Sequence, residues 1–271
     1  MSDTAVALAG ENLTLAYESR TISRGLDVAI PAGRVTVIVG PNGCGKSTLL
    51  RALSRLLSPK EGRVLLEGAD VRRLGGKPFA RRLALLPQSS QAPSGITVAD
   101  LVARGRFPHQ RMLRQWSAAD RDAVERAYAA TGVGELADRT VDELSGGQRQ
   151  RVWIAMLLAQ DAPTMLLDEP TTFLDISHQL EVLELVRRLN ADEGRTMVLV
   201  LHDLNQAARY ADHLVVMRDG AVAATGAPDE VLTEQLLGDV FGLDARVVPD
   251  PVFGTPHVIP VASRSRGVGG D

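Results

Sequence analysis

The stretch GPNGCGKST, from Gly40 to Thr48, holds residues whose types and spacing suit the binding of a nucleotide phosphate. It matches the pattern G-x-x-x-x-G-K-[ST], in which backbone N–H groups and the start of a helix face one anion. Lys46 would reach the β- and γ-phosphates, and the Ser47 hydroxyl would hold Mg²⁺. A glycine-rich turn without a ligand is the structural alternative. The residues expected around the phosphates are Gly40, Pro41, Asn42, Gly43, Cys44, Gly45, Lys46, Ser47 and Thr48.

The segments on either side of this loop predict the elements that such a site requires. The preceding run RVTVIVG is β-branched and unbroken, which predicts a parallel strand buried on both faces. Leucines recur at helical spacing from Leu49 to Leu57. Only three of the 30 basic residues are lysines, so Lys46 indicates a need for a compact ammonium group rather than for charge alone.

Two adjacent carboxylates, Asp168 and Glu169, end the apolar segment TMLLDEP. Acidic residues at the carboxyl end of a strand lie beside the phosphate loop in a parallel sheet. Asp168 would therefore hold Mg²⁺, directly or through water, and Glu169 would orient and deprotonate the attacking water. A solvated strand end is the alternative interpretation.

The segment ELSGGQRQRVWIAMLLAQ predicts a helix that begins near Ser145. A capping box explains Ser145 and Gln148, but it leaves Gly146 and Gly147 unexplained, since each costs a helix about 1 kcal/mol. Glycines at a helix start let the backbone approach another group closely, and the N-terminus of a helix suits an anion. We therefore expect a second phosphate-binding element here.

Composition limits the class of protein. The chain has 271 residues, is 45% hydrophobic and carries a net charge of −3, so a sizeable core is expected and nucleic acid is not an expected partner. No apolar run reaches the length of about 18 to 20 residues that a membrane span needs, and the first residues lack a signal-peptide pattern, so a cytosolic location is expected. The single cysteine, Cys44, excludes disulfides within the chain, and the five histidines lack ligand spacing, so neither iron nor zinc binding is expected.

Turn and helix signals divide the chain into α and β regions. Short apolar groups and turns from Leu13 to Ile38 predict antiparallel strands, and EGRVLLEGADV predicts a further hairpin strand. Capping patterns at Thr97 and Ser117 predict helices between Ile96 and Asp138. A helix over 176–190, a strand over 196–202 and a hairpin turn at 219–220 follow, and the polar tail is expected to be mobile.

Three segments together, GPNGCGKST, LSGGQRQR and LLDEPTTFLD in this order, resemble the Walker A, signature and Walker B sequences of the ATP-binding cassette (ABC) ATPases. The resemblance covers nearly the whole chain. It implies an α/β fold of the P-loop NTPase class, with a mainly parallel core sheet, an antiparallel β-subdomain and a helical subdomain. The expected single nucleotide-binding domain, 1–271, then divides into the core with its β-subdomain (5–90 and 160–262), the helical subdomain (91–159) and the tail (263–271).

The same resemblance implies ATP hydrolysis with Mg²⁺ and a head-to-tail pair of cassettes. The signature residues of one copy would contact the γ-phosphate held by Lys46 of the other; these residues are Ser145, Gly146, Gly147 and Gln148. Other roles carried over are stacking on adenine for Tyr17, a link from nucleotide and Mg²⁺ to the membrane partner for Gln88, an interface position for Asp175, and contact with the γ-phosphate and water for His202. By themselves, Tyr17 and His202 would be ordinary half-buried residues.

Finer similarity points to a transport system. LVARGRFPHQ, EPTTFLDISHQLEVLELVRRLN and FGLDARVVPDPVFGTPHVIP are similar to cassettes that power uptake of ferric siderophores, with ferric citrate, haem and cobalamin importers as relatives. This implies an ATPase subunit at the cytoplasmic face of a bacterial inner membrane, acting with permease subunits and indirectly with a substrate-binding lipoprotein. The arginines at 104, 106, 111 and 114 would face the permease or form a solvated face.

Two other classes of protein fit the sequence less well. Soluble ABC-type ATPases that act on DNA or ribosomes usually carry a long coiled-coil insertion or two fused cassettes, and neither pattern is found in this sequence. A GTPase switch would be expected to carry N-K-x-D, which is also missing from the sequence.

Overall fold

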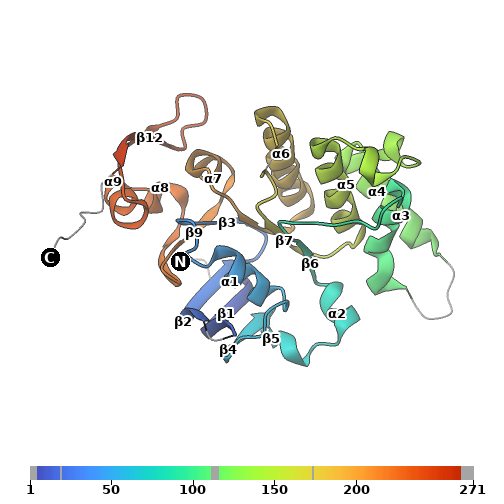
Figure 1. The fold of residues 1–271 in the computed structure, drawn as a ribbon, viewed down its shortest axis with the longest axis horizontal. Coiled ribbons are helices and arrows are strands. Elements are labelled where there is room, and N and C mark those ends of the chain that lie inside the picture. The colour runs from blue at the N-terminus through green and yellow to red at the C-terminus, as the bar shows by residue number, and fades with distance from the viewer. Residues whose placement is uncertain (1–4, 19, 111–115, 173, 264–271) are drawn as a thin grey trace.

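A six-stranded sheet forms the core of the protein (Figure 1). The structure is a computed structural model that describes residues 5–18, 20–110, 116–172 and 174–263. The strand order is β10-β9-β3-β8-β7-β6, with parallel pairing from β9 through β6 and β10 antiparallel to β9. The strands are β3 (Val35–Val39), β6 (Leu83–Leu86), β7 (Thr164–Asp168), β8 (Thr196–Val200), β9 (His213–Arg218) and β10 (Ala221–Gly226).

Every residue of β3, β7 and β8 is buried, because both faces of this sheet are covered. Alternate side chains enter two different cores. Val37 and Leu199 pack with helices on one face, whereas Ile38 and Val198 pack with the second sheet on the other. The parallel strand buried on both faces that is expected before the phosphate loop is thus confirmed.

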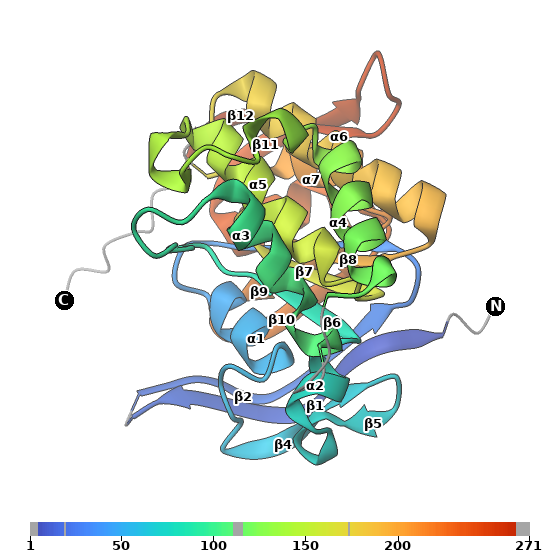
Figure 2. The same ribbon diagram turned by 90° about the vertical axis from the view of Figure 1, so that its right-hand side faces the viewer.

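The second sheet is antiparallel and lies below the core sheet in Figure 2, with α1 (Lys46–Leu53) between the two. Leu49, Leu50 and Leu53 of α1 are fully buried there. This sheet has the order β2-β1-β4-β5. Its strands are β1 (Val6–Tyr17), β2 (Arg20–Pro31), β4 (Glu61–Leu66) and β5 (Ala69–Asp70).

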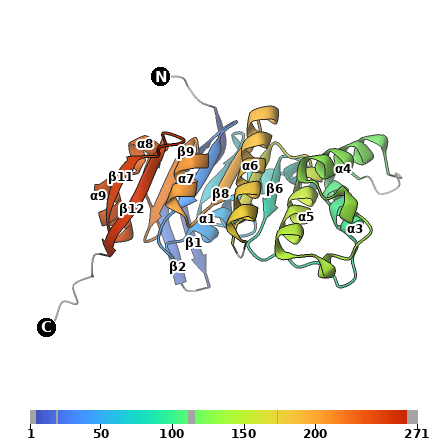
Figure 3. The ribbon, with the colours of Figure 1, turned by 90° about the horizontal axis from the view of Figure 1, so that it is seen from above.

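Helices cover the other face of the core sheet and extend to one side of it (Figure 3). Thr97 and Ser117 cap helices as the sequence predicts, each accepting a hydrogen bond from a backbone N–H three residues later. The elements of this helical region are α3 (Val98–Ala103), the 3₁₀ segment η2 (Arg104–His109), α4 (Ala118–Thr131) and α5 (Gly146–Ala159).

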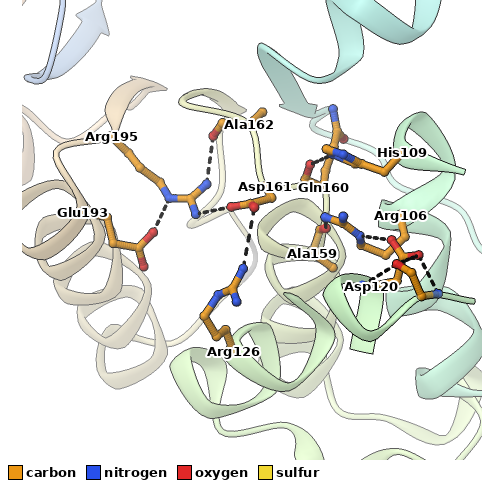
Figure 4. A network of polar contacts seen from close by, with 11 residues as sticks. Arg106, His109, Asp120, Arg126, Ala159, Gln160, Asp161, Ala162, Glu193 and Arg195 are labelled. Atoms are coloured by element: carbon orange, nitrogen blue, oxygen red, sulfur yellow. Dashed lines mark hydrogen bonds and ion pairs between the residues drawn. The ribbon is translucent and has the colours of Figure 1, made fainter. Parts of the chain in front are cut away.

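Polar contacts join this helical region to the core sheet (Figure 4). Arg106 is buried, pairs with Asp120 at 2.8 Å and donates to the carbonyl of Ala159 at the end of α5. Asp161, at the start of the segment leading to β7, lies between Arg126 of α4 and Arg195 beside β8. The C-terminal end of α5 is therefore held by Arg106, which bonds to Ala159, and by the ion pairs that Asp161 forms just after the helix.

The remaining elements surround the sheet. The C-terminal hairpin lies at the end of the molecule opposite α3 and α4 (Figure 3). These elements are α2 (Gly76–Ala80), α6 (Ile176–Glu193), α7 (Leu204–Tyr210), α8 (Pro228–Val231), α9 (Glu234–Leu236), β11 (Leu243–Pro249) and β12 (Pro256–Ser263). Short helical turns cover Val71–Arg73, Gly134–Leu136, Val141–Glu143 and Leu237–Phe241.

The fold class expected from the sequence is confirmed, and some element boundaries differ. The helix after the phosphate loop ends at Leu53, because Arg55 adopts a φ of 64°, and Leu56 is exposed. The helix expected over 176–190 continues to Glu193, and Ser263, expected in the tail, ends β12. Residues 264–271 lie outside the described residues. Among the described residues, no helix combines the length and apolar character that crossing a bilayer requires.

Candidate nucleotide site

The phosphate loop curls between β3 and α1 because its glycines adopt backbone conformations that other residues avoid. Gly40 and Gly43 have φ values of 155° and 77°. A Cβ at Gly40 would lie 2.2 Å from the Met217 carbonyl oxygen, so a side chain cannot be accommodated there. Cys44 is buried within the loop, and burial raises the pKa of its thiol.

Lys46 lies inside this curl. Its side chain is buried, and Nζ donates to the carbonyl oxygens of Gly40 at 2.9 Å and Pro41 at 3.1 Å. A cavity of 280 Å³ opens beside it. The residues that line the cavity are Arg20, Ile22, Asn42, Gly43, Gly45, Lys46, Ser47, Thr48, Glu169 and His202. The loop amides and the ammonium group of Lys46 suit a phosphate chain. The carboxylate of Glu169 and the imidazole of His202 suit an attacking water.

Ser47 and Asp168 form a pair that suits a divalent cation. The Ser47 hydroxyl donates to Asp168 Oδ1 at 3.0 Å, and Asp168 is buried. Burial raises the pKa of Asp168; the hydrogen bond from Ser47 opposes that rise, and the charge of Glu169 adds to it. A buried carboxylate beside a hydroxyl and a second carboxylate supplies oxygen ligands of the kind that Mg²⁺ prefers. These residues therefore fit the ion that the sequence implies.

The carboxylate of Glu169 contacts polar side chains from the segments that follow β6, β7 and β8. Gln88 follows β6, Glu169 follows β7 and His202 follows β8, so all three lie at the carboxyl edge of the sheet. Glu169 Oε2 accepts from Gln88 Nε2 at 2.7 Å and from the Thr172 hydroxyl at 3.2 Å, and Oε1 lies 2.7 Å from His202 Nε2. Glu169 has a φ of 53° and its side chain is only 10% exposed. The residues predicted to act on water and Mg²⁺ are thus brought together.

Tyr17 lies at the end of β1 and is half exposed, outside the lining of the phosphate cavity. Its hydroxyl accepts a hydrogen bond from Arg51 of α1 at 3.2 Å. Arg20, which pairs with Tyr17 across the β1–β2 turn, lines the cavity together with Ile22. Sequence reasoning missed these two residues, and only the closeness of Arg20 to Tyr17 in the sequence could have indicated one of them.

The signature residues lie outside the phosphate cavity of their own chain. The capping box expected at the start of α5 forms: the Ser145 hydroxyl accepts from the Gln148 N–H at 3.3 Å, and Gln148 Oε1 accepts from the Ser145 N–H at 3.1 Å. A Cβ at Gly146 would meet nothing within 4 Å, whereas one at Gly147 would lie 2.5 Å from His178 Cδ2. Within one chain, the close approach at Gly147 is to His178, and its approach to phosphate stays a prediction.

Asp175 lies beside the signature turn through His178. Its Oδ1 accepts from the His178 N–H at 3.0 Å and lies 2.7 Å from His178 Nδ1. Of the arginines considered as permease contacts, Arg106 is buried in the ion pair with Asp120 and Arg104 is exposed. Arg111 and Arg114 lie outside the described residues.

A larger hollow of 920 Å³ lies elsewhere, between β1 and β2 on one side and β9 and β10 on the other. Its lining includes Val28, Leu65 and Val222, together with the carboxylates of Glu11 and Asp27. Carboxylates repel phosphate, so the smaller cavity beside Lys46 is the one that suits a nucleotide.

Comparisons with known proteins agree with this geometry. The protein family described as ABC transporter matches residues 23–172. The chain is 53% identical over 261 residues to the ferric enterobactin transport ATP-binding protein FepC of Escherichia coli (strain K12), covering 96% of each chain. It is 55% identical over 254 residues to the achromobactin transport ATP-binding protein CbrD of Dickeya dadantii (strain 3937), covering 94% of each.

Solved structures show the same fold. A transporter described as of the metal-chelate ABC type, in an inward-facing conformation, aligns with a TM-score of 0.81 at 28% identity, covering 95% of this chain and 98% of that chain. The dimeric structure of the bacterial ABC transporter cassette MJ0796 aligns with a TM-score of 0.73 at 27% identity, covering 81% of this chain and 98% of that chain. The phosphate loop, the carboxylates after β7 and these similarities together show that the chain belongs to the ABC transporter family, as an ATPase of the siderophore-transport group.

Proposed function

We propose that this chain is the subunit that hydrolyses ATP to drive import of a ferric siderophore through a membrane permease. The observation that carries the proposal is the convergence of Gln88 and His202 on Glu169, beside the pair formed by Ser47 and Asp168. This contact supports a role for Glu169 as general base, because Glu169, His202 and Ser47 line one cavity and Gln88 and Asp168 contact them there. The cargo assignment is supported by relatives named for the transport of enterobactin and achromobactin.

In the proposed reaction, Glu169 takes a proton from water as the water attacks the γ-phosphorus and the bond to the β-phosphate breaks. Lys46 and the loop N–H groups stabilise the charge on the phosphates. His202 holds the water and a γ-phosphate oxygen in line with Glu169. Ser47, Asp168 and Gln88 would hold Mg²⁺, which would supply positive charge to offset the negative charge of the phosphates.

We propose further that two copies close head to tail around two ATP molecules. The signature turn from Ser145 to Gln148 lies outside the cavity of its own chain, so a second copy is needed to bring this helix start to the γ-phosphate. The similarity to a cassette solved as a dimer supports this arrangement. ATP would favour closure because its γ-phosphate is contacted from both sides only in the closed pair.

The permease would receive this motion through the segment after β6, where Gln88 contacts Glu169. A second contact region is the hollow of 510 Å³ lined by Arg104, Phe107 and Trp116, in which Phe107 is 66% exposed. In this proposal the chain acts at the cytoplasmic face of the bacterial inner membrane, and a substrate-binding lipoprotein acts on the opposite side.

Uptake of radiolabelled ferric siderophores by cells that lack this chain tests the proposal. We expect loss of uptake of at least one siderophore. The wild-type chain should restore uptake, and Glu169→Gln, which is expected to bind ATP without hydrolysing it, should not. Normal uptake of every ferric siderophore with loss of cobalamin or haem uptake would reassign the cargo. Normal uptake of all of them would contradict an import function and favour a soluble ATPase.

A further inference from the structure

His178 connects two segments of one chain that would each meet the partner copy. It lies in the first turn of α6, three residues after Asp175, and its ring is packed against Gly147 in the first turn of α5. We infer that His178 is a positioning residue that holds Asp175 and the signature turn as one unit and thereby couples the two ATP sites of the dimer. This inference rests on the proposed head-to-tail pairing.

The first half of this connection is a set of hydrogen bonds to one oxygen. Asp175 Oδ1 accepts from the Ser177 hydroxyl at 2.8 Å and from the His178 N–H at 3.0 Å, and lies 2.7 Å from His178 Nδ1. The backbone N–H of His178, followed by the side chains of Ser177 and His178, lowers the pKa of Asp175 to about 2. An ionised carboxylate only accepts hydrogen bonds, so Nδ1 carries the proton in this contact.

The second half is a steric contact. The ring atoms Cδ2, Cγ and Nε2 of His178 would lie 2.5, 2.9 and 3.0 Å from a Cβ at Gly147. The imidazole therefore occupies the space that a side chain at Gly147 would need. Gly147 is buried, whereas the neighbouring Ser145 and Gly146 are exposed. His178 therefore contacts the buried side of the signature turn and leaves its exposed side accessible to another molecule.

A neighbouring ion pair extends the contact between the two helices. Arg151 of α5 lies 3.6 Å from Glu181 of α6. His178 and Glu181 are three residues apart and Gly147 and Arg151 are four apart, so each pair lies on one face of its helix. The first two turns of α5 and of α6 therefore share a continuous contact that begins at His178.

This contact has a consequence for the dimer. In a head-to-tail pair, the signature turn of a chain meets the partner's ATP, while Glu169 of the same chain acts on its own ATP. Asp175 caps α6 and lies six residues after Glu169. A movement of the signature turn would therefore displace His178, and His178 would in turn displace Asp175 and the segment that joins it to Glu169. ATP bound at one site would thus favour the productive geometry at the other.

Three substitutions test the role of His178. His178→Ala removes both halves of the connection. His178→Phe fills the space beside Gly147 but lacks the donor to Asp175. Ser177→Ala is the matched control, because it removes one hydrogen bond to the same Asp175 oxygen without touching Gly147. If His178 acted only by strengthening the cap of α6, Ser177→Ala and His178→Ala would have similar effects.

The measurements are ATP-driven dimerisation of the full chain in a Glu169→Gln background, by sedimentation, and the Hill coefficient of ATP hydrolysis in the otherwise wild-type chain. We expect His178→Ala to weaken dimerisation about 5- to 20-fold and to lower the Hill coefficient toward 1, with less than about a twofold change in ATP binding by the monomer. His178→Phe should fall between wild type and His178→Ala, and Ser177→Ala should stay within about twofold of wild type.

The outcomes separate this inference from the proposed function. If Glu169→Gln alone fails to dimerise with ATP, the proposed pairing is wrong. If it dimerises and His178→Ala dimerises equally well with an unchanged Hill coefficient, the inference about His178 is overturned while the pairing stands. Equal losses in His178→Ala and Ser177→Ala would also overturn it, because the effect would then belong to the helix cap.

Discussion

At the scale of single residues, the proposed chemistry depends on the carboxylate of Glu169. It is nearly buried and contacts Gln88, Thr172 and His202 at once. These contacts fix its orientation before any water arrives, which is the preorganisation that a general base needs.

Replacing Glu169 with Gln should lower the rate of ATP hydrolysis by roughly 10² to 10⁴, a range typical for loss of a general base, and leave ATP binding nearly unchanged. Glutamine keeps the shape of the side chain but cannot accept the proton. Turnover and nucleotide affinity are measured on the same preparation, with Glu125→Gln, an exposed site on α4, as the control. Turnover close to that of wild type would remove Glu169 from this role.

The two signature glycines allow a second test at this scale, because their surroundings differ. A Cβ at Gly146 meets nothing within 4 Å, whereas one at Gly147 collides with His178. Gly146→Ala should keep or raise the melting temperature, since alanine favours a helix by about 1 kcal/mol over glycine, yet weaken ATP-driven dimerisation. Gly147→Ala should lower the stability of the monomer itself by about 1 to 3 kcal/mol.

Thermal unfolding and sedimentation of both variants measure these effects. Because a methyl group at Gly146 would contact nothing within its own chain, a loss of dimerisation in Gly146→Ala would arise across the interface. Unimpaired ATP-driven dimerisation of this variant would mean that the signature turn does not approach the partner's nucleotide closely.

At the scale of elements, the helical region depends on the buried pair of Arg106 and Asp120 (Figure 4). Burial alone would raise the pKa of Asp120, but hydrogen bonds from Ser117 and Arg106 outweigh it and lower the pKa to about 2. Arg106 also donates to the carbonyl of Ala159, so this pair supports the C-terminal end of α5. A change at this pair should therefore loosen the signature helix.

Asp120→Asn should destabilise the protein at neutral pH by about 3 to 5 kcal/mol, because it leaves Arg106 buried without its counter-charge. The pKa of Asp120 is lower in the folded state than in the unfolded state, so its stabilising effect is complete above about pH 4 and disappears as the pH falls through about 2. Denaturant unfolding at pH 7 and over this acid range measures both effects.

The exposed Asp122→Asn on the same helix is the control. Its unfolding free energy should stay within about 0.5 kcal/mol of wild type. The difference between the two variants should shrink as the pH falls below 4. A difference independent of pH would contradict the assigned role of the Asp120 charge.

The sequence predicts those parts of the fold that depend on local pattern. The buried β-branched strand before Gly40, the caps at Thr97 and Ser117, and the phosphate loop with Lys46 follow from residue types and spacing, whereas Arg20 and Ile22 of the cavity do not. The early end of α1 does not, because the leucine spacing continues past Leu53 while the backbone turns at Arg55.

Contacts between distant segments are harder to predict. The approach of His178 to Gly147 joins two helices that are separate in the sequence, and no local pattern indicates it. The hairpin of β11 and β12 was also missed, since prolines at 249, 251, 256 and 260 interrupt the alternation that marks a strand. The backbone of this hairpin is held at Val258 by Asn205, a partner more than fifty residues earlier.

At the scale of the whole molecule, the C-terminal hairpin is fastened to α7, the helix that follows His202. Asn205 accepts from the Val258 N–H at 2.7 Å and donates to the Val258 carbonyl at 3.2 Å, and the Arg209 guanidinium lies 3.8 Å from the centre of the Phe253 ring. The hairpin therefore buttresses one end of the sheet that carries the site.

Asn205→Ala should lower the unfolding free energy by about 1 to 3 kcal/mol, because it leaves the Val258 backbone groups without their partner. Asp244→Ala, exposed on β11, is the control and should change stability by less than about 0.5 kcal/mol. Denaturant unfolding compares the two variants. Equal effects would mean that the amide of Asn205 does not fasten the hairpin.

In the proposed pair, each nucleotide site is divided between two copies. One chain carries the phosphate loop and Glu169 around a cavity, while its signature turn lies outside the lining of that cavity. The most direct measurement is a structure of the Glu169→Gln chain with ATP and Mg²⁺ bound. We expect one γ-phosphate to contact Lys46 of one copy and the Ser145 turn of the other. An ATP-loaded assembly in which these two groups do not share a nucleotide would contradict the account.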